Sequence, residues 1–270
     1  SFAWPIDCAL IVRDRAVKVR TGSPKLLEPD YNSRALAKDP LKRKPAMSDN
    51  HRWRWVALYA VAMAWVEATI VFYLRTIANQ PGPYQPIAAE FPLTLVRTEM
   101  GREAATLLML LAVGWLAGRS WRSRLGYTLV AFGLWDLFYY VFLAVITGWP
   151  RSIADWDILF LLPLPWWGPV WSPVSIAVLM VAGGTLMSRY DQAQRPLWPR
   201  GWAWRVQGAG LVLALYVFMA DAIRVMGEGM EAWRVLRPTW FNWPLFLVAL
   251  LLMAAPFLDV WRQQRNGRAA

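Results

Sequence analysis

Three carboxylic acids interrupt stretches of this sequence that are otherwise apolar enough to be membrane helices. Asp136 is the only formal charge in the 23-residue run from Leu125 to Thr147, and Glu67 and Asp221 lie inside two other apolar segments. A carboxylate at the centre of a bilayer costs roughly 2.5 to 3.5 kcal/mol on insertion scales, so it normally faces a partner, a cavity or a pathway. The chemistry open to such groups is proton transfer, cation binding, or binding of a basic or hydroxylated ligand.

Helical spacing places possible partners beside two of these acids. Tyr139 and Tyr140 follow Asp136 by three and four residues, and Arg224 follows Asp221 by three residues. Side chains at these spacings share one face of a helix. The tyrosine hydroxyls and the guanidinium group are therefore within possible reach of the neighbouring carboxylates.

A further group of charges lies at the start of another apolar segment. In the run TEMGRE, the carboxylates of Glu99 and Glu103 are four residues apart and Arg102 lies between them. Like charges at this spacing are unfavourable unless a cation accompanies them, and Arg102, Arg97 or a metal ion could provide it. The candidate polar site predicted from the sequence therefore consists of Glu67, Glu99, Arg102, Glu103, Asp136, Tyr139, Tyr140, Asp157, Asp221 and Arg224.

Each of these groups also has a purely structural interpretation. Asp221 and Arg224 are most simply a neutralised pair near the end of a helix, and the charges around Arg102 are most simply an interfacial salt-bridge cluster. Asp136 and Glu67 could each be a hydrogen-bonded acid that holds two helices together.

The residue inventory excludes several kinds of metal and redox chemistry. The chain has one cysteine, Cys8, and one histidine, His51, so it forms no internal disulfide, and histidine-held haem, copper sites and iron–sulfur clusters are excluded. No cofactor is evident, although oxygen ligands would suit a divalent cation such as Mg²⁺. The sequence has no DDxxD cluster, Ser/His/Asp set or HExxH motif, which leaves an enzymatic function without a signature.

Composition and segment lengths indicate a membrane protein. Hydrophobic residues make up 57% of the chain, the mean hydropathy is +0.29, and there are 19 Trp, a residue favoured at bilayer interfaces. We predict an all-α polytopic membrane protein with six transmembrane helices, in which the lipid bilayer surrounds segments at about residues 55–74, 94–118, 125–147, 172–188, 208–226 and 244–261.

The arginine distribution predicts the orientation of these spans. Twelve of the 19 arginines after Met47 fall before the first span, after the second, after the fourth and after the sixth, which is one side of a six-span protein. The positive-inside rule then places both termini in the cytoplasm. Glu67, Asp136 and Asp221 lie at the centre or in the outer half of their spans. We expect a multi-pass protein of a bacterial inner (plasma) membrane; the net charge of +11 follows from this pattern and does not indicate a nucleic-acid partner.

One apolar segment between the third and fourth spans is too short and too rich in proline to cross the bilayer. Residues 157–171, DILFLLPLPWWGPVW, contain three prolines, which cannot share one regular helix. The segment is predicted to be re-entrant or interfacial, with Trp166 and Trp167 as anchors at the outer interface. The alternative is a proline-rich lead-in to the fourth span, with Pro173 in its first turn.

The first 46 residues differ in composition from the rest of the chain. They contain all five lysines, five prolines and one of the 19 Trp, and they show no sustained periodicity. We expect residues 1–46 to be a disordered basic segment that is not native, with Met47 as the natural start and residues 47–270 as the transmembrane domain. The alternative is a genuine basic cytoplasmic tail.

Three functions are consistent with these features. The first is an outward-facing acidic site within the membrane that binds or moves a cation, a proton or a small basic solute. The second is a non-catalytic accessory or assembly subunit, whose acids pair with a membrane-protein partner. The third is a membrane-embedded enzyme acting on a lipid or isoprenoid, which the absence of a catalytic motif disfavours.

Overall fold

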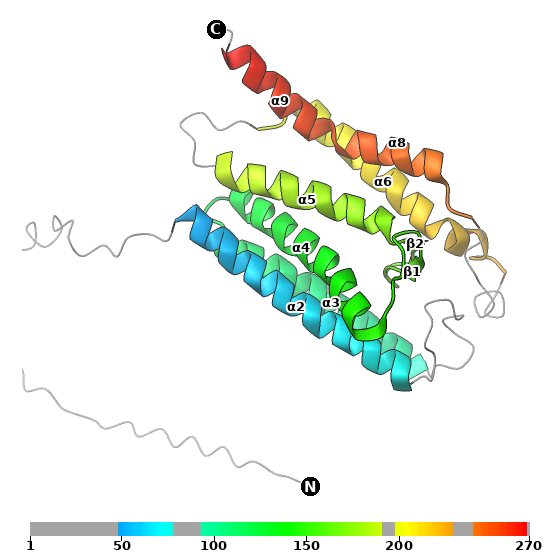
Figure 1. Ribbon diagram of the computed structural model, residues 1–270. Coiled ribbons are helices and arrows are strands. Elements are labelled where there is room, and N and C mark those ends of the chain that lie inside the picture. The colour runs from blue at the N-terminus through cyan, green and yellow to red at the C-terminus, as the bar shows by residue number, and fades with distance from the viewer. Residues whose placement is uncertain (1–47, 78–92, 191–197, 229–239, 269–270) are drawn as a thin grey trace, which may run out of the picture. The chain divides into compact units, whose positions relative to one another are not determined.

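The computed structural model describes residues 48–77, 93–190, 198–228 and 240–268, most of which are helical (Figure 1). The predicted segment 1–46 lies outside these described residues. The helices are α2 (Asp49–Ile77), α3 (Leu93–Ala117), α4 (Trp121–Thr147), α5 (Trp171–Tyr190), α6 (Gly201–Arg224), α8 (Trp243–Met253) and α9 (Ala255–Arg268). Two short strands, β1 (Trp156–Ile158) and β2 (Trp167–Pro169), lie between α4 and α5.

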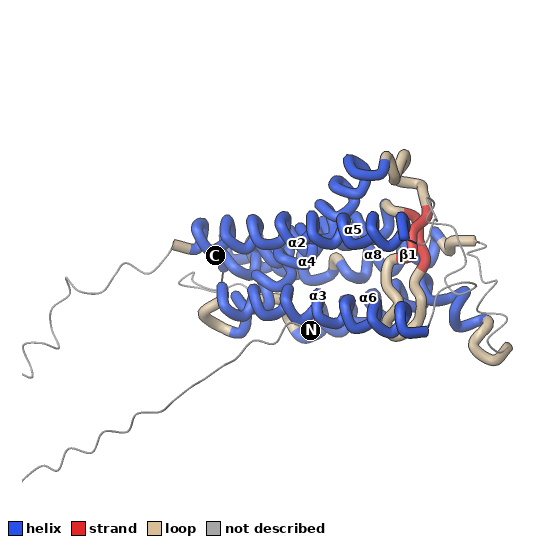
Figure 2. Tube along the Cα trace, turned by 90° about the horizontal axis from the view of Figure 1, so that it is seen from below, coloured by secondary structure: helices blue, strands red, loops and turns tan. Residues whose placement is uncertain are grey.

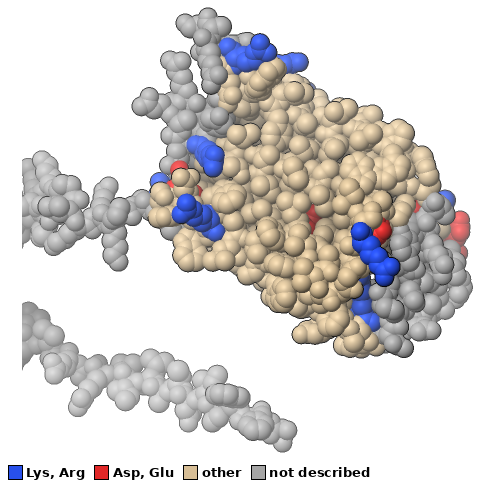
Figure 3. All heavy atoms as spheres, in the orientation of Figure 1, with Lys and Arg blue, Asp and Glu red and all other residues tan. Residues whose placement is uncertain are grey.

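Six helical segments of the described chain are long and apolar enough to cross a membrane, which confirms the predicted number of spans. The last of them, Trp243–Arg265, consists of α8 and α9 together, and the helix is interrupted at Ala254. Pro256 accounts for this interruption, because it has no N–H to donate to the preceding turn. Figure 3 shows that charged side chains gather near the ends of the helices on the face drawn, whereas its middle is almost entirely uncharged.

Local sequence signals set the limits of α4, the helix that carries Asp136. The Ser120 hydroxyl accepts a hydrogen bond from the N–H of Ser123 at 3.1 Å, and the Ser123 hydroxyl accepts one from the N–H of Ser120 at 3.0 Å. This reciprocal capping box satisfies two donors at the helix start. The helix ends at Gly148, whose positive φ of 72° is a conformation that glycine adopts without strain.

Small residues bring the neighbouring helices into close contact with α4. This helix packs against α2, α3 and α5, and α6 packs against α8. Gly126 of α4 faces Gly184 of α5, and a Cβ atom on Gly126 would lie 2.8 Å from the Gly184 carbonyl oxygen. On α2, Ala60 and Ala64 are fully buried. These contacts are typical of membrane helices, in which small residues allow the backbones to approach.

The proline-rich segment forms a two-stranded antiparallel hairpin between α4 and α5, at one end of the helices (Figures 1 and 2). In its register, Asp157 is opposite Gly168. Trp166 and Trp167 pack inward, in contrast to the predicted interfacial anchors: Trp167 is 6% exposed, and Trp166 stacks on Phe218 of α6 with ring centroids 6.1 Å apart. The reason is that β2 packs against α6, so both rings fill the space between the hairpin and that helix.

Candidate functional site

A cavity of about 430 Å³ lies among α2, α3, α4, α5, α6 and the β1–β2 hairpin. Its volume is within the range of about 300–1,000 Å³ that is usual for small-molecule sites. Each helix lines it with one stripe of side chains. On α4, for example, the lining residues Phe132, Trp135, Asp136, Tyr139 and Tyr140 follow the i, i+3, i+4, i+7, i+8 spacing of a single helix face.

Eight of the ten residues predicted from the sequence line this cavity, namely Glu67, Glu99, Arg102, Glu103, Asp136, Tyr139, Tyr140 and Asp157. Two further polar residues of the lining, Arg75 and Thr106, were not predicted. Both carry the same signal as their neighbours, since Arg75 follows Glu67 by eight residues and Thr106 follows Glu99 by seven. The sequence therefore contained enough information to include them.

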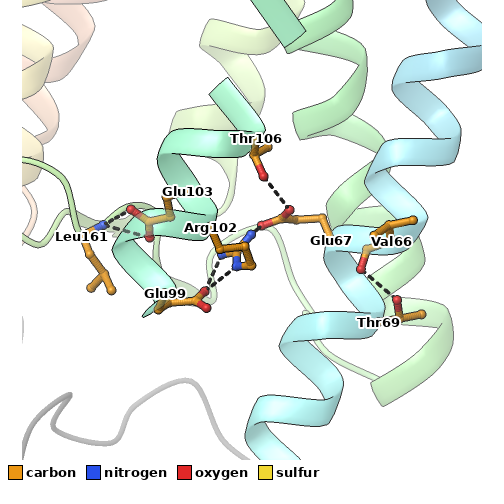
Figure 4. Close-up of polar contacts among 8 residues, drawn as sticks. All are labelled: Val66, Glu67, Thr69, Glu99, Arg102, Glu103, Thr106 and Leu161. Atoms are coloured by element: carbon orange, nitrogen blue, oxygen red, sulfur yellow. Dashed lines mark hydrogen bonds and ion pairs between the residues drawn. The ribbon is translucent and has the colours of Figure 1, made fainter. Parts of the chain in front are cut away.

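Arg102 is the centre of an ion-pair cluster that joins α3 to α2 (Figure 4). Its guanidinium group pairs with Glu67 of α2, and its Nε donates to Glu99 Oε1 at 2.9 Å. The Thr106 hydroxyl donates to the second oxygen of Glu67 at 3.3 Å. Glu67 is only 5% exposed, so these contacts compensate a carboxylate that has lost most of its water.

Glu103 is directed away from this cluster and connects α3 to the hairpin (Figure 4). Both of its carboxylate oxygens accept from the N–H of Leu161, at 3.1 and 3.0 Å. The two carboxylates that are four residues apart in the sequence therefore have different partners. Glu99 is paired with Arg102, whereas Glu103 accepts from a backbone N–H. The contact attaches the loop between β1 and β2 to α3, and both Glu103 and Leu161 line the cavity.

Asp157 of β1 forms a second charged contact at the hairpin end of the cavity. Its Oδ1 lies 3.6 Å from Nη2 of Arg75, and the Arg75 guanidinium also lies over the ring of Trp149, 4.7 Å from the centroid. Asp157 is 4% exposed, and burial raises its pKa to about 6, although Arg75, the N–H of Ile158 and the Tyr140 hydroxyl each lower it. Asp157 therefore titrates close to neutral pH.

Asp136 differs from the other carboxylates of the lining. It is partly buried, its charged neighbour is the like-charged Asp157, and within the described part of the chain it forms no hydrogen bond or ion pair. An unpaired carboxylate in largely apolar surroundings is costly. A bound cation, a proton or a hydrogen-bond donor of a ligand could compensate the charge of Asp136.

Aromatic rings form a continuous wall from Asp136 across the cavity. Tyr139 stacks on Trp135 at 6.4 Å, Trp135 lies 6.3 Å from Phe160, and Phe160 lies 5.3 Å from Trp166. Trp166 in turn stacks on Phe218 of α6. All five rings line the cavity, so we call this set the aromatic wall.

Asp221 and Arg224 do not line the cavity. They form an ion pair at 2.9 Å at the end of α6, where the Arg224 side chain is 54% exposed. The α6 residues that line the cavity, from Leu211 to Phe218, end one turn earlier. This geometry is that of a neutralised pair at a helix end.

No group of three or more carboxylate, histidine or cysteine side chains within the described ranges is arranged to hold a metal ion. A scan of the sequence against protein-family models, and searches among curated proteins and solved structures, find no significant match.

Proposed function

We propose that this protein binds a small basic or cationic solute in the cavity, with the carboxylate of Asp136 as its counter-ion. The observation that carries the proposal is the difference between Asp136 and the other acids of the lining. Each of the others is paired with an arginine or a backbone N–H, whereas Asp136 has no such partner among the described residues. A ligand cation would supply the compensation that this carboxylate lacks.

The charge balance of the lining supports a cationic ligand. The cavity is lined by five carboxylates and two arginines, and no other charged side chain of the described chain lines it. Arg102 is engaged by Glu67 and Glu99. Arg75 is paired with Asp157 through Nη2, while its buried Nη1 has no hydrogen-bond partner among the described residues. The field inside the cavity is therefore negative when the acids are ionised, and low-dielectric walls strengthen that field.

The position of the cavity supports access from the outer side. Each helix contributes the half nearest the hairpin, such as residues 67–75 of α2 and 132–140 of α4. The arginine-rich connections, including Arg119, Arg122 and Arg124, lie at the opposite ends of these helices. With the arginine-rich side in the cytoplasm, the cavity lies in the outer half of the membrane.

The test is binding of methylammonium to the full chain in nanodiscs whose lipid, phosphatidylcholine, has no primary amine. Equilibrium dialysis with radiolabelled methylammonium, corrected for empty nanodiscs, gives the bound fraction. Asp136→Asn removes the charge with little change of shape, and Asp221→Asn is the matched control, because Asp221 is a helix carboxylate outside the cavity.

We expect saturable binding to the parent and to Asp221→Asn, and at least a tenfold weaker affinity for Asp136→Asn. A tenfold loss corresponds to about 1.4 kcal/mol, close to the lower end of the roughly 1.5–3 kcal/mol that a hydrogen bond to a charged group contributes. Equal affinity in the parent and Asp136→Asn would contradict the proposal.

A further inference from the structure

We infer that the ligand is an amphipathic amine, with its ammonium group at Asp136 and an apolar body against the aromatic wall and the apolar side of α5 and α6. This inference rests on the proposed function, because it describes the rest of the molecule whose cation Asp136 binds. The ligand is therefore an organic cation that is much larger than an ammonium ion.

The two sides of the cavity differ in chemistry. Its charged side chains come from α2, α3, α4 and the start of the hairpin. The α5 and α6 residues that line it are all apolar, namely Pro173, Ile176, Ala177, Met180, Leu211, Ala214, Leu215 and Phe218. A hydrated inorganic cation would gain nothing from that second surface, whereas an alkyl or aryl group would be removed from water there.

The two surfaces meet at α4, which carries Asp136 beside Trp135. A cation held by Asp136 therefore lies at the start of the aromatic wall, and ring faces attract cations electrostatically. From Trp135 the wall runs through Phe160 and Trp166 to Phe218, where the last two rings are nearly parallel, with an interplanar angle of 5°. The same wall therefore suits both the head and the body of one amphipathic molecule.

The test compares three compounds in phosphatidylcholine nanodiscs: methylammonium, hexylammonium and hexanol. Affinities are referred to the free aqueous concentration after dialysis, so that partition into the lipid does not affect them. Complete burial of one methylene strengthens binding roughly fourfold. We expect hexylammonium to bind the parent at least tenfold more tightly than methylammonium, and hexanol to bind weakly and independently of Asp136.

Substitutions on α6 test where the apolar body lies. Leu215→Trp places a larger side chain in the cavity and is expected to weaken hexylammonium binding at least tenfold while leaving methylammonium binding unchanged. Val212→Trp is the matched control, because Val212 is 67% exposed and does not line the cavity. If Leu215→Trp does not fold, Leu215→Ala is used instead. We expect Leu215→Ala to weaken the affinity for hexylammonium about fivefold, because apolar contact is lost, and to leave the affinity for methylammonium unchanged.

The outcomes separate this inference from the proposed function. Equal, Asp136-dependent affinities for methylammonium and hexylammonium would overturn the amphipathic ligand and leave the cation site standing. Binding that does not depend on Asp136 for either amine would overturn both. Adding phosphatidylethanolamine to the nanodiscs then identifies the source of the amine: competition with hexylammonium indicates a lipid headgroup, and its absence indicates a free amine.

Discussion

Replacement of Arg102 by methionine tests the ion-pair cluster that joins α2 to α3. Methionine keeps most of the length of the side chain but removes the donors to Glu67 and Glu99. Glu67 would keep the Thr106 hydroxyl at 3.3 Å and lose the cation with which it is paired. A carboxylate that is 5% exposed is then left without charge compensation.

The expected cost follows from the burial of the two partners. Removal of one member of a buried ion pair costs about 3–5 kcal/mol. We expect the lower end, about 3 kcal/mol, because one fifth of the Arg102 side chain is exposed and Glu99 is exposed to the same extent. Arg97→Met is the matched control: Arg97 is an exposed arginine of the same helix, and its replacement should change stability by less than about 0.5 kcal/mol.

A double-mutant cycle in detergent micelles, with the free energy of unfolding measured by denaturant titration, isolates the pair. Glu67→Gln together with Arg102→Met removes the unpaired charge at position 67 and leaves only the more exposed Glu99 without its cation, so the double variant should be more stable than Arg102→Met alone by at least about 1 kcal/mol. Equal stability of Arg102→Met and Arg97→Met, or strict additivity in the cycle, would refute the assignment of Arg102 as the cation that compensates Glu67.

Two further predictions concern the hairpin and the contact between α4 and α5. The pKa of Asp157 is about 6 in the folded protein, above its ordinary value of 3.8, so the folded state binds this proton more tightly than the unfolded state. The resulting contribution to the free energy of unfolding is fully present below about pH 4 and is lost as the pH rises through 6. The total is on the order of 3 kcal/mol, and the melting temperature of Asp157→Asn should lack this part of the pH dependence; identical profiles for parent and variant would contradict it. At Gly133, a Cβ atom would lie 2.6 Å from the Ala177 carbonyl oxygen, so Gly133→Ala should lower stability by about 1–3 kcal/mol, whereas Gly208→Ala, with open space around it, should not; equal melting temperatures would disprove the close contact.

The membrane helices were predictable because their signal is local. The apolar run Leu125–Thr147 corresponds to α4, and the additional first turn of that helix comes from the capping box at Ser120 and Ser123. Convergence of the acids was also partly predictable, since polar side chains within apolar helices face inward to avoid lipid.

The partners of these acids were less predictable, because their donors come from distant parts of the chain. Glu103 accepts from the N–H of Leu161, and a backbone donor 58 residues away leaves no signal in residue type. The ion pair of Asp157 with Arg75 depends on the path of the hairpin, which also turns Trp166 inward. Such contacts depend on tertiary packing, which spacing along one helix does not determine.

The division of roles among the acids explains how a charged cavity can exist within apolar helices. Glu67, Glu103 and Asp157 each connect two elements, and their pairing fixes the walls while compensating most of the buried charge. This leaves Asp136 in a preorganised position, next to the aromatic wall. Under the proposed function, an ionised Asp136 without a partner destabilises the ligand-free protein, and a bound cation would remove that penalty. Ligand binding and stability should therefore be coupled through this carboxylate, whereas substitutions at the paired acids should act first on the shape of the cavity.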